Sequence, residues 1–349
     1  MTGGAQMGYL SRDYSIKDLA KECGISVSTV SKVLNGYPNI SEKTRRKVLE
    51  TADMYGYVPN TAAKILKKST SKNIVLMIND PLHVHVNLMI MEYTKVMRSA
   101  GYDLVISYIN GEDPVFAALK AVKENRAVGV VFLGKSVSGR EREIEGFGIP
   151  VILHEMDVEL STVDNVSSFY VNEVMESYRM TKFLQERGAR KIAFFTTEKE
   201  GSTVGGLRTL GYKMALDEEN PNLIISVEGN HYKGGYESMT RLIKLEIEAD
   251  AVLCVSDRLA MGCCRALYDL KRKVPEEVIV AGFDGSEFVD YMIPSITTIN
   301  LPVRKIFHDS AQHLLDRISR GEPKCYKCYE CTITEKESTA VRKTLDKRF

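Results

Sequence analysis

Apolar residues between positions 16 and 55 recur at the three- and four-residue spacing of amphipathic helices, and they predict three short helices. The first helix has one apolar face, made of Ile16, Leu19, Ala20 and Cys23. Ser15 can cap this helix, and Asp18 completes a capping box. Gly24 then permits a sharp turn, because a residue without a Cβ atom enters the left-handed region at little cost. Two short helices joined through a glycine turn indicate a helix-turn-helix.

The second helix is predicted to have a polar outer face. Ser26 can cap it, and its inward residues are Val30, Val33 and Leu34. Its outward residues are Val27, Ser28, Ser31 and Lys32. Short hydroxyl side chains and a cation suit phosphate oxygens and base edges, although a solvated and well-capped helix would have the same pattern.

A third helix and a linker segment are predicted to follow. Ser41 can cap a helix that runs to about Tyr55. The residues expected on its inner face are Val48, Leu49 and Ala52, and those of its early turns are Lys43, Arg45, Arg46 and Lys47. Pro59 forbids a simple continuation, and the segment 61–68 is too short to be a stable helix alone. We expect that segment to fold only when it is paired or bound.

From residue 73 onward, short apolar runs alternate with helical patterns. The first series has strands at 74–78, 103–108, 128–133 and 150–153, and helices at 88–100 and 114–125. The second has strands at 191–196, 224–228, 251–256 and 278–283, and helices at 207–218, 235–245 and 258–270. Strands that alternate with helices favour an α/β fold with parallel, doubly wound sheets. Two such series predict two lobes, with a ligand cleft at the carboxyl ends of their strands.

Charge is unevenly distributed along the 349 residues, although the net charge is only +1. Residues 9–72 hold 12 lysines and arginines against 6 acidic residues, and the remainder holds 35 against 40. A basic head on a mildly acidic body suits contact with a polyanion such as DNA. The alternative explanation of the uneven charge is chance clustering of the basic residues. No apolar run approaches the length of a membrane span. Residues 1–8 lack the features of a secretory signal, and we expect them to be a tag remnant.

The cysteines are scattered, which predicts reduced thiols and a cytoplasmic protein. They are Cys23, Cys254, Cys263, Cys264, Cys325, Cys328 and Cys331. The last three have a regular spacing that a thiolate site could use. Their neighbours instead favour an extended strand that points successive cysteines to opposite faces. We therefore expect no metal and no cofactor.

Residues 15–68 resemble the DNA-binding head and hinge of the lactose-repressor (LacI/GalR) family. The matching motifs are residues 16–20, 24–26, 29–36 and 56–60. The resemblance implies DNA base contacts by Val27, Ser28, Lys32, Leu66 and Lys67, and phosphate contacts by Ser26, Thr29, Ser31 and Asn35. Leu66 matches the hinge leucine that a dimer inserts into a minor-groove step, which kinks the duplex.

The body resembles the periplasmic-binding-protein-like effector domain of the same family. The matching motifs are residues 188–194, 208–212, 256–262, 282–285 and 294–299. The resemblance implies effector contacts by Arg208, Asp284, Ser256 and Asp257. Arg208 and Asp284 could instead form a structural ion pair across an empty cleft.

The first lobe departs from the common family pattern at several positions. His83 and His85 replace an Asn-Pro-aromatic motif, His154 and Glu155 stand where an aspartate is frequent, and 171–173 reads Val-Asn-Glu. These histidines and Glu155 are further effector candidates. They also raise the hypothesis of a metal or an anionic effector. The spacing of four metal ligands is not evident, so solvated or hydrogen-bonded loop histidines are expected.

The domains that follow from these patterns are a helix-turn-helix head at 9–58 and a hinge helix and linker at 59–72. The first effector lobe is 73–171 with about 301–329, and the second is 172–300 with about 330–345.

The predicted function is that of a repressor that binds a palindromic operator as a dimer, with a tetramer left open. Its binding is expected to be controlled by a sugar, a phosphosugar or another metabolite. The alternative is control by a docked protein, as in catabolite-control members whose partner is a phosphorylated carrier protein. The motifs of common enzyme classes are lacking, so an enzyme is the remote alternative.

Overall fold

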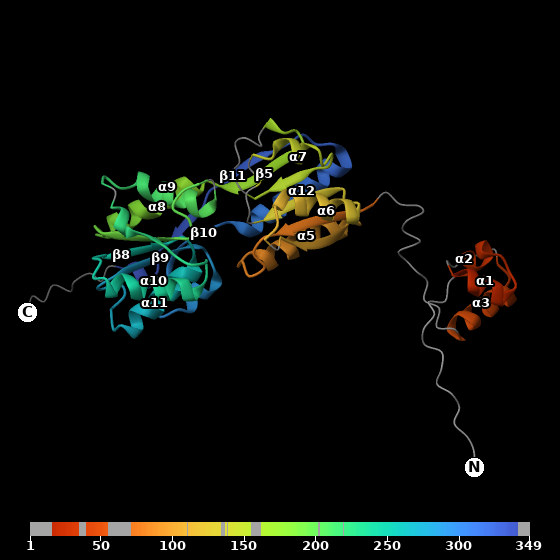
Figure 1. The fold of residues 1–349 in the computed structure, drawn as a ribbon, viewed down its shortest axis with the longest axis horizontal. Coiled ribbons are helices and arrows are strands. Elements are labelled where there is room, and N and C mark those ends of the chain that lie inside the picture. The colour runs from red at the N-terminus through yellow and green to blue at the C-terminus, as the bar shows by residue number, and fades with distance from the viewer. Residues whose placement is uncertain are drawn as a thin grey trace, which may run out of the picture. The chain divides into compact units, whose positions relative to one another are not determined.

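The computed structural model describes residues 16–34, 40–54, 71–109, 111–133, 137, 139–154, 162–201, 203–218 and 220–340. The chain divides into two compact units, residues 1–70 and 71–349 (Figure 1). Among the described residues, no helix is both long and apolar enough to cross a membrane.

The first unit contains α1 (Ile16–Cys23), α2 (Val27–Leu34) and α3 (Glu42–Met54). Its buried core is formed by seven residues that the sequence predicted, with Ile16 and Leu34 partly buried beside them: Leu19, Ala20, Cys23, Val30, Val33, Val48 and Ala52. Gly24 has a φ of +62° in the turn between α1 and α2, as expected. The hydroxyl of Ser26 accepts a hydrogen bond from the Thr29 amide at 3.1 Å, which confirms this cap. The predicted cap of α3 by Ser41 is confirmed in the same way, through the Thr44 amide at 3.2 Å.

One predicted core residue of the head was wrong. Leu49 was expected on the inner face of α3, but its side chain is 45% exposed. Val48 and Ala52 are four residues apart and face the other two helices, so Leu49 lies about 100° around the helix from Val48 and beyond the buried stripe. The linker residues 55–70, with Leu66 and Lys67, lie outside the described part of the chain.

The first lobe of the body is a parallel sheet with the strand order β11-β5-β4-β3-β1-β2. The strands are β1 (Asn73–Ile78), β2 (Asp103–Tyr108), β3 (Gly129–Leu133), β4 (Val151–Leu153), β5 (Val166–Val171) and β11 (Tyr326–Tyr329). The helices are α5 (Val86–Ser99), α6 (Pro114–Asn125), α7 (Glu141–Glu145) and α12 (Val303–Arg320). Ile74, Leu76 and Ile78 belong to the core that includes α5 and α12, whereas Val75 and Met77 pack with α6. Burial on both faces explains why β1 is wholly apolar.

The second lobe is a sheet with the strand order β12-β10-β9-β8-β6-β7, parallel except where β12 pairs antiparallel with β10. Its strands are β6 (Ile192–Thr196), β7 (Ile224–Ser226), β8 (Ala251–Cys254), β9 (Ile279–Asp284), β10 (Thr297–Asn300) and β12 (Thr332–Thr334). Its helices are α8 (Glu173–Glu186), α9 (Val204–Met214), α10 (Tyr232–Lys244) and α11 (Asp257–Asp269), with 3₁₀ turns η2 (Pro221–Leu223), η3 (Glu287–Tyr291) and η4 (Glu337–Thr339).

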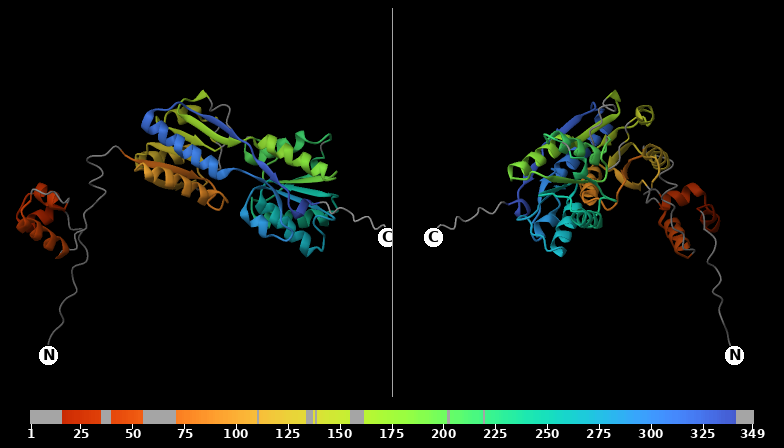
Figure 2. Two further views of the ribbon diagram at one scale, coloured as in Figure 1. Left: turned by 180° about the vertical axis from the view of Figure 1, so that it is seen from behind. Right: turned by 60° about the vertical axis from the view of Figure 1, so that its left-hand side comes forward.

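The chain passes between the two lobes three times. Figure 2 shows the two lobes and the segments that connect them from two further directions. The passages fall between β5 and α8, between β10 and α12, and between β11 and β12. The third passage contains Cys331. A single extended strand was predicted around residues 325–333, but the structure has two strands there, β11 and β12, in different sheets. The chain leaves the first sheet after Tyr329 and joins the second at Thr332, because each sheet takes one strand from this segment. Cys331 is buried and Cys328 is exposed.

Two glycines allow α10 and α11 to pack closely in the second lobe. A Cβ atom on Gly262 would lie under 3 Å from the backbone of Tyr232, and one on Gly235 would meet the backbone of Leu259 equally closely. The two helices therefore approach through their backbones. This packing fixes α11, whose first residues face the other lobe.

Candidate functional site

The outer face of α2 presents the side chains that the sequence assigned to DNA. Val27 is 41% exposed, and Ser28 and Lys32 are exposed as well. The Ser26 hydroxyl lies 2.8 Å from both the Ser28 and the Thr29 hydroxyls, so the start of α2 carries a cluster of hydroxyl groups beside free helical amides. Ser31 is half-buried, and Asn35 lies outside the described residues.

A second group of polar side chains gathers where the carboxyl ends of the two sheets face each other. We call it the interlobe cluster. From the first lobe it contains Asp80, His83 and His85, and from the second lobe it contains Glu173, Arg208, Asp257, Arg258 and Asp284. Asp80 and the two histidines follow β1, Asp284 ends β9, and Asp257 and Arg258 begin α11 after β8. Parallel sheets bind ligands at such ends.

Arg258 joins the two lobes directly. Its Nη2 atom donates to Asp80 Oδ2 at 3.0 Å, and its Nη1 atom donates to the Leu82 carbonyl at 3.1 Å. Among the described residues, its buried Nε atom has no hydrogen-bond partner. Arg258 therefore holds two groups of the first lobe through its Nη atoms, and its Nε–H group is not used in either contact.

Arg208 is the most enclosed cation of the interlobe cluster, with 4% of its surface exposed. Its Nε atom donates to Glu173 Oε2 at 2.6 Å, and its Nη1 atom donates to Asp284 Oδ1 at 3.2 Å and also to the Val255 carbonyl. The guanidinium carbon lies 3.4 Å from the centre of the Phe283 ring, a close cation–π contact. Burial alone would lower the pKa of Arg208, but Glu173 and Asp284 outweigh burial and raise it.

The two histidines are packed edge to face, with ring centroids 5.3 Å apart. Burial lowers the pKa of His83, against the attraction of Asp284. Burial lowers the pKa of His85 to about 4, again against Asp284. Both rings are therefore neutral near pH 7. His85 Nε2 is buried and has no hydrogen-bond partner in the part of the chain that the structure describes.

Ser256 and Asp257 form a layer behind Arg208. The Ser256 hydroxyl caps α11 through the Leu259 amide at 3.3 Å and contacts Asn230. Asp257 accepts from the Thr298 hydroxyl at 2.6 Å and from the Ser286 amide at 2.7 Å. Burial, together with the nearby Asp284 charge, raises the pKa of Asp257 to about 8. Both side chains thus hold the loops that carry the cluster.

His154 lies among side chains of the first lobe. Its Nε2 atom is 3.2 Å from the Tyr93 hydroxyl, and its ring packs edge to face against Phe307 at 5.0 Å between centroids. Burial lowers the pKa of His154 to about 4. His154 therefore contacts Tyr93 and Phe307, whereas His83 and His85 contact each other, so the three histidines do not form one group. Glu155 lies outside the described residues.

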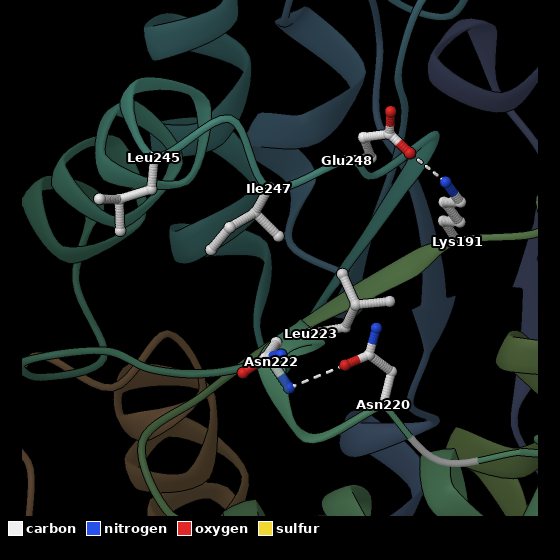
Figure 3. Close-up of a pocket in the computed structure, with 7 residues that line it drawn as sticks. All are labelled: Lys191, Asn220, Asn222, Leu223, Leu245, Ile247 and Glu248. Carbon is white, nitrogen blue, oxygen red and sulfur yellow. Dashed lines mark hydrogen bonds and ion pairs between the residues drawn. The ribbon is translucent and has the colours of Figure 1, made fainter.

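One hollow of the second lobe does not belong to the interlobe cluster. Figure 3 shows a hollow of about 540 Å³ in the second lobe, lined by Leu223, Leu245 and the Lys191–Glu248 ion pair. Lys191 directly precedes β6, so this hollow lies at the amino end of the sheet, opposite to the usual ligand position. Within the described residues, three or more metal-binding side chains are not grouped as a metal site would require.

Sequence reasoning missed three members of the interlobe cluster. Asp80 lies two residues after the end of β1, and its position near a strand end was the available signal. Glu173 was noted only as a departure from the family pattern. Arg258 was part of a matched motif, but its contact with Asp80 joins residues 178 positions apart.

The body and the head each match a known protein family. Residues 15–60 match the family described as bacterial regulatory proteins, lacI family. Residues 181–339 match the periplasmic binding protein-like domain. A helix-turn-helix head with a two-lobed body of this kind defines a DNA-binding transcriptional regulator.

Relatives extend the match over nearly the whole chain. The HTH-type transcriptional regulator MalR of Clostridium butyricum is 30% identical over 332 residues, which cover 93% of this chain and 98% of that protein. The probable HTH-type transcriptional repressor ExuR of Bacillus subtilis is 30% identical over 323 residues, covering 91% and 96%. The chain therefore belongs to the lacI family of bacterial regulatory proteins. A lac repressor dimer bound to operator and the anti-inducer ONPF shares the fold, with a TM-score of 0.68, 22% identity and coverage of 94% and 99%.

Proposed function

We propose that this chain is a cytoplasmic, dimeric repressor whose operator affinity is set by a small molecule bound at the interlobe cluster. The observation that carries the proposal is the cluster itself. Charged and polar side chains from both lobes meet at the carboxyl ends of the parallel strands of two sheets, and two buried nitrogen atoms there have no hydrogen-bond partner among the described residues. Buried polar atoms of this kind are usually satisfied by a ligand or water.

The proposed mechanism is a change in lobe orientation. A ligand that contacts Arg258 or His85 also contacts the ends of the other lobe, so it favours one arrangement of the two lobes over others. The head and the linker 59–72 precede the first lobe in the chain. In a dimer, the arrangement of the lobes sets the spacing of the two linkers, which pair and insert Leu66 into the minor groove only in one spacing.

For the head, we propose base contacts by Val27, Ser28 and Lys32, with Leu66 and Lys67 at the minor groove. Ser26, Thr29, Ser31 and Asn35 are proposed to hold phosphates. The exposure of the α2 outer face supports this assignment. The proposed domains are those of the sequence analysis, and the membership of β11 in the first sheet and of β12 in the second supports the boundary near residue 330.

The test is operator binding by the full chain, measured by fluorescence anisotropy with and without a panel of metabolites. We expect a preference for a palindromic duplex over random duplex and a change in affinity with one class of metabolite. Leu66→Ala should weaken operator binding and reduce DNA bending while metabolite binding is retained. A monomer without any preference for palindromes would contradict the proposal.

The family is one of transcriptional regulators rather than enzymes, and we propose binding without catalysis for this chain too. The two arginines of the interlobe cluster pair with Glu173, Asp284 and Asp80, and a nucleophile beside a general base is not among the described contacts of the cluster. Incubation of the chain with the metabolite panel should leave every compound unchanged.

A second candidate is control by a protein partner docked on the first lobe. A hollow of about 670 Å³ lies between α5 and α12, with apolar walls that include Leu88 and Val303. Lys95, Arg304 and Lys305 border it and suit an acidic or phosphorylated partner, although Glu92 and Asp309 line it as well and Arg304 pairs with Glu92 at 2.6 Å. Arg304→Glu should abolish control by such a partner and leave control by a metabolite intact.

A further inference from the structure

The third passage between the lobes consists of Glu330 and Cys331, and the second of these residues is buried. Tyr329 ends β11 and lies in register with Val171 of β5, whereas Thr332 begins β12 of the second sheet. Cys331 is 3% exposed, although it lies between two sheets that belong to different lobes. A buried residue in a short connection is held by the lobe that it contacts, and here that lobe is the second.

Glu176 and Arg179, one turn apart on α8, hold Cys331 on the side of the second lobe. Arg179 Nη1 donates to the Cys331 carbonyl at 3.3 Å and to Glu176 Oε2 at 2.7 Å. Burial raises the pKa of Glu176, and the charge of Arg179 and the backbone amide of Cys331 oppose this shift. Both polar backbone groups of Cys331 therefore face one ion pair. Because α8 begins directly after the first passage, this ion pair also connects the first passage to the third.

The second and third passages are connected in the same lobe. Asn300 is the last residue of β10, directly before the second passage, and its side-chain amide donates to the Thr334 hydroxyl of β12. The two strands also pair through their backbones, with Asn300 opposite Thr332. The three segments that meet the boundary of the second lobe are therefore joined to one another.

Asp309 of α12 has the corresponding role in the first lobe. It accepts from Lys327 Nζ at 2.7 Å and from the Tyr329 hydroxyl at 2.9 Å. Since α12 follows the second passage and β11 precedes the third, Asp309 joins these two segments in the first lobe. The residues that lie between the joined ends are Asn172, Leu301, Pro302 and Glu330. Hinges between domains are a few residues of this kind, which absorb the change in backbone angles.

We propose that Glu176 and Arg179 form a hinge clamp, which fixes Cys331 to the second lobe and confines bending of the third passage to Glu330. The three passages then bend at one level, and the lobes move as two rigid bodies. The hinge clamp adjoins the interlobe cluster, because the charges of Glu173 and Arg208 act on the Cys331 thiol. The inference goes beyond the proposed function, since it states how the lobes move and not which molecule moves them.

The experiment is alkylation of the full chain by iodoacetamide, with the rate at each cysteine measured by mass spectrometry. Cys328 is exposed and should react first, whereas the buried Cys331 should react only when the hinge clamp opens. Arg179→Met removes the donor to the Cys331 carbonyl, and the reaction at Cys331 should become at least about fivefold faster, as for the loss of one hydrogen bond. Burial raises the pKa of Cys331 to about 12 and the charge of Arg179 lowers it, so loss of that charge alone would slow the reaction.

Arg187→Met is the matched control. Arg187 follows α8 and pairs with Glu335 at 2.6 Å, so it also joins α8 to the last part of the chain, but Glu335 lies after β12 rather than before it. This variant should leave the rate at Cys331 unchanged. Cys254 and Cys263 of the second lobe are fully buried, and they should keep their rates in both variants.

Two results would overturn the inference. One is an unchanged rate at Cys331 in Arg179→Met, and the other is an equal increase at Cys254 and Cys263, which would show general loosening of the second lobe. If Arg179→Met fails to fold, site-resolved hydrogen exchange of the unmodified chain decides. Relative to their intrinsic rates, the Cys331 amide should exchange at least about tenfold more slowly than the Glu330 amide, and equal exchange would contradict the hinge clamp. Neither measurement uses operator or metabolite, so either can fail while the proposed function stands.

Discussion

Arg258 and Asp80 form an ion pair at 3.0 Å that connects the start of α11 in the second lobe to the end of β1 in the first. Arg258 also donates to the Leu82 carbonyl, so one side chain contacts two points of the opposite lobe. This contact stabilises the arrangement of the two lobes described above, and an effector that favours a different arrangement must break it.

The first prediction concerns the strength of this contact. Asp80→Asn, Arg258→Gln and the double variant should give a coupling energy of about 0.5–1 kcal/mol in urea unfolding, since Asp80 is 40% exposed and water screens the pair. The single variants should also increase the radius of gyration in small-angle scattering. Arg265→Gln is the control, because Arg265 pairs with Asp269 at the same distance within one helix. A control variant that expands as much would argue against an interlobe role.

The second prediction concerns the pH dependence of stability. Burial raises the pKa of Asp257 to about 8 in the folded chain, whereas an unfolded aspartate titrates near 3.9. Between about pH 4 and pH 8, the folded chain retains a proton that the unfolded chain has released. The stability that Asp257 contributes is therefore complete below pH 4 and is lost as the pH rises towards 8.

Asp257→Asn should remove this dependence, because an amide does not titrate. The free energy of unfolding of the unmodified chain, relative to this variant, should decrease from pH 5 to about pH 8 in urea titrations and then level off. Asp269→Asn is the control: the Arg265 hydrogen bond lowers the pKa of Asp269, so it titrates below this window. A difference between the unmodified chain and Asp257→Asn that does not change with pH would refute the assignment.

The third prediction concerns the close packing of α10 and α11. Gly262→Ala places a methyl group against the backbone of Tyr232, which cannot move without its helix. We expect a loss of about 1–3 kcal/mol in stability, as for other overpacked cores. Arg265→Ala, on the exposed side of the same helix, should cost far less. Equal losses in thermal unfolding would show that the two backbones do not meet as described.

The fourth prediction concerns the outer face of α2. Lys32 is exposed, and we propose that it contacts a base edge. Lys32→Ala should cost about 1–3 kcal/mol on the preferred operator and reduce discrimination at one position of each half-site. Lys43→Ala, in the exposed first turn of α3, should weaken binding equally on all sequences. Anisotropy titrations over a set of operator variants distinguish the two patterns.

Local patterns in the sequence were sufficient for much of the fold. The strand at 103–108 and the helix at 114–125 were predicted with the boundaries that the structure has, because turn residues flank both elements. The helix expected at 207–218 begins instead at Val204, after its cap Thr203. Gly205 and Gly206 weakened the helical pattern there, and both are needed for close packing.

Two elements, β5 and α12, were not predicted, although the buried residues Ile306, Ala311 and Leu314 of α12 follow helical spacing and Gly321 ends this helix in the left-handed region. The interlobe cluster was only partly predictable because its contacts join residues that lie far apart in the sequence. Arg208 and Asp284 lie at matched motifs, but the Glu173–Arg208 contact joins residues 35 positions apart, and it depends on how α8 packs against α9. His154 also follows a strand end, as several residues of the interlobe cluster do, but Tyr93 and Phe307 pack around it. Strand order and side-chain packing, which the sequence does not show, determine which of these residues join the interlobe cluster.

The three passages of the chain between the lobes have a consequence for biosynthesis. The edge strand β11 of the first sheet and the edge strand β12 of the second both come from the last tenth of the polypeptide. A nascent chain on the ribosome can therefore complete neither lobe until residues 326–334 have emerged. A premature stop codon anywhere before that segment should yield a product with two unfinished sheets, which proteases would degrade.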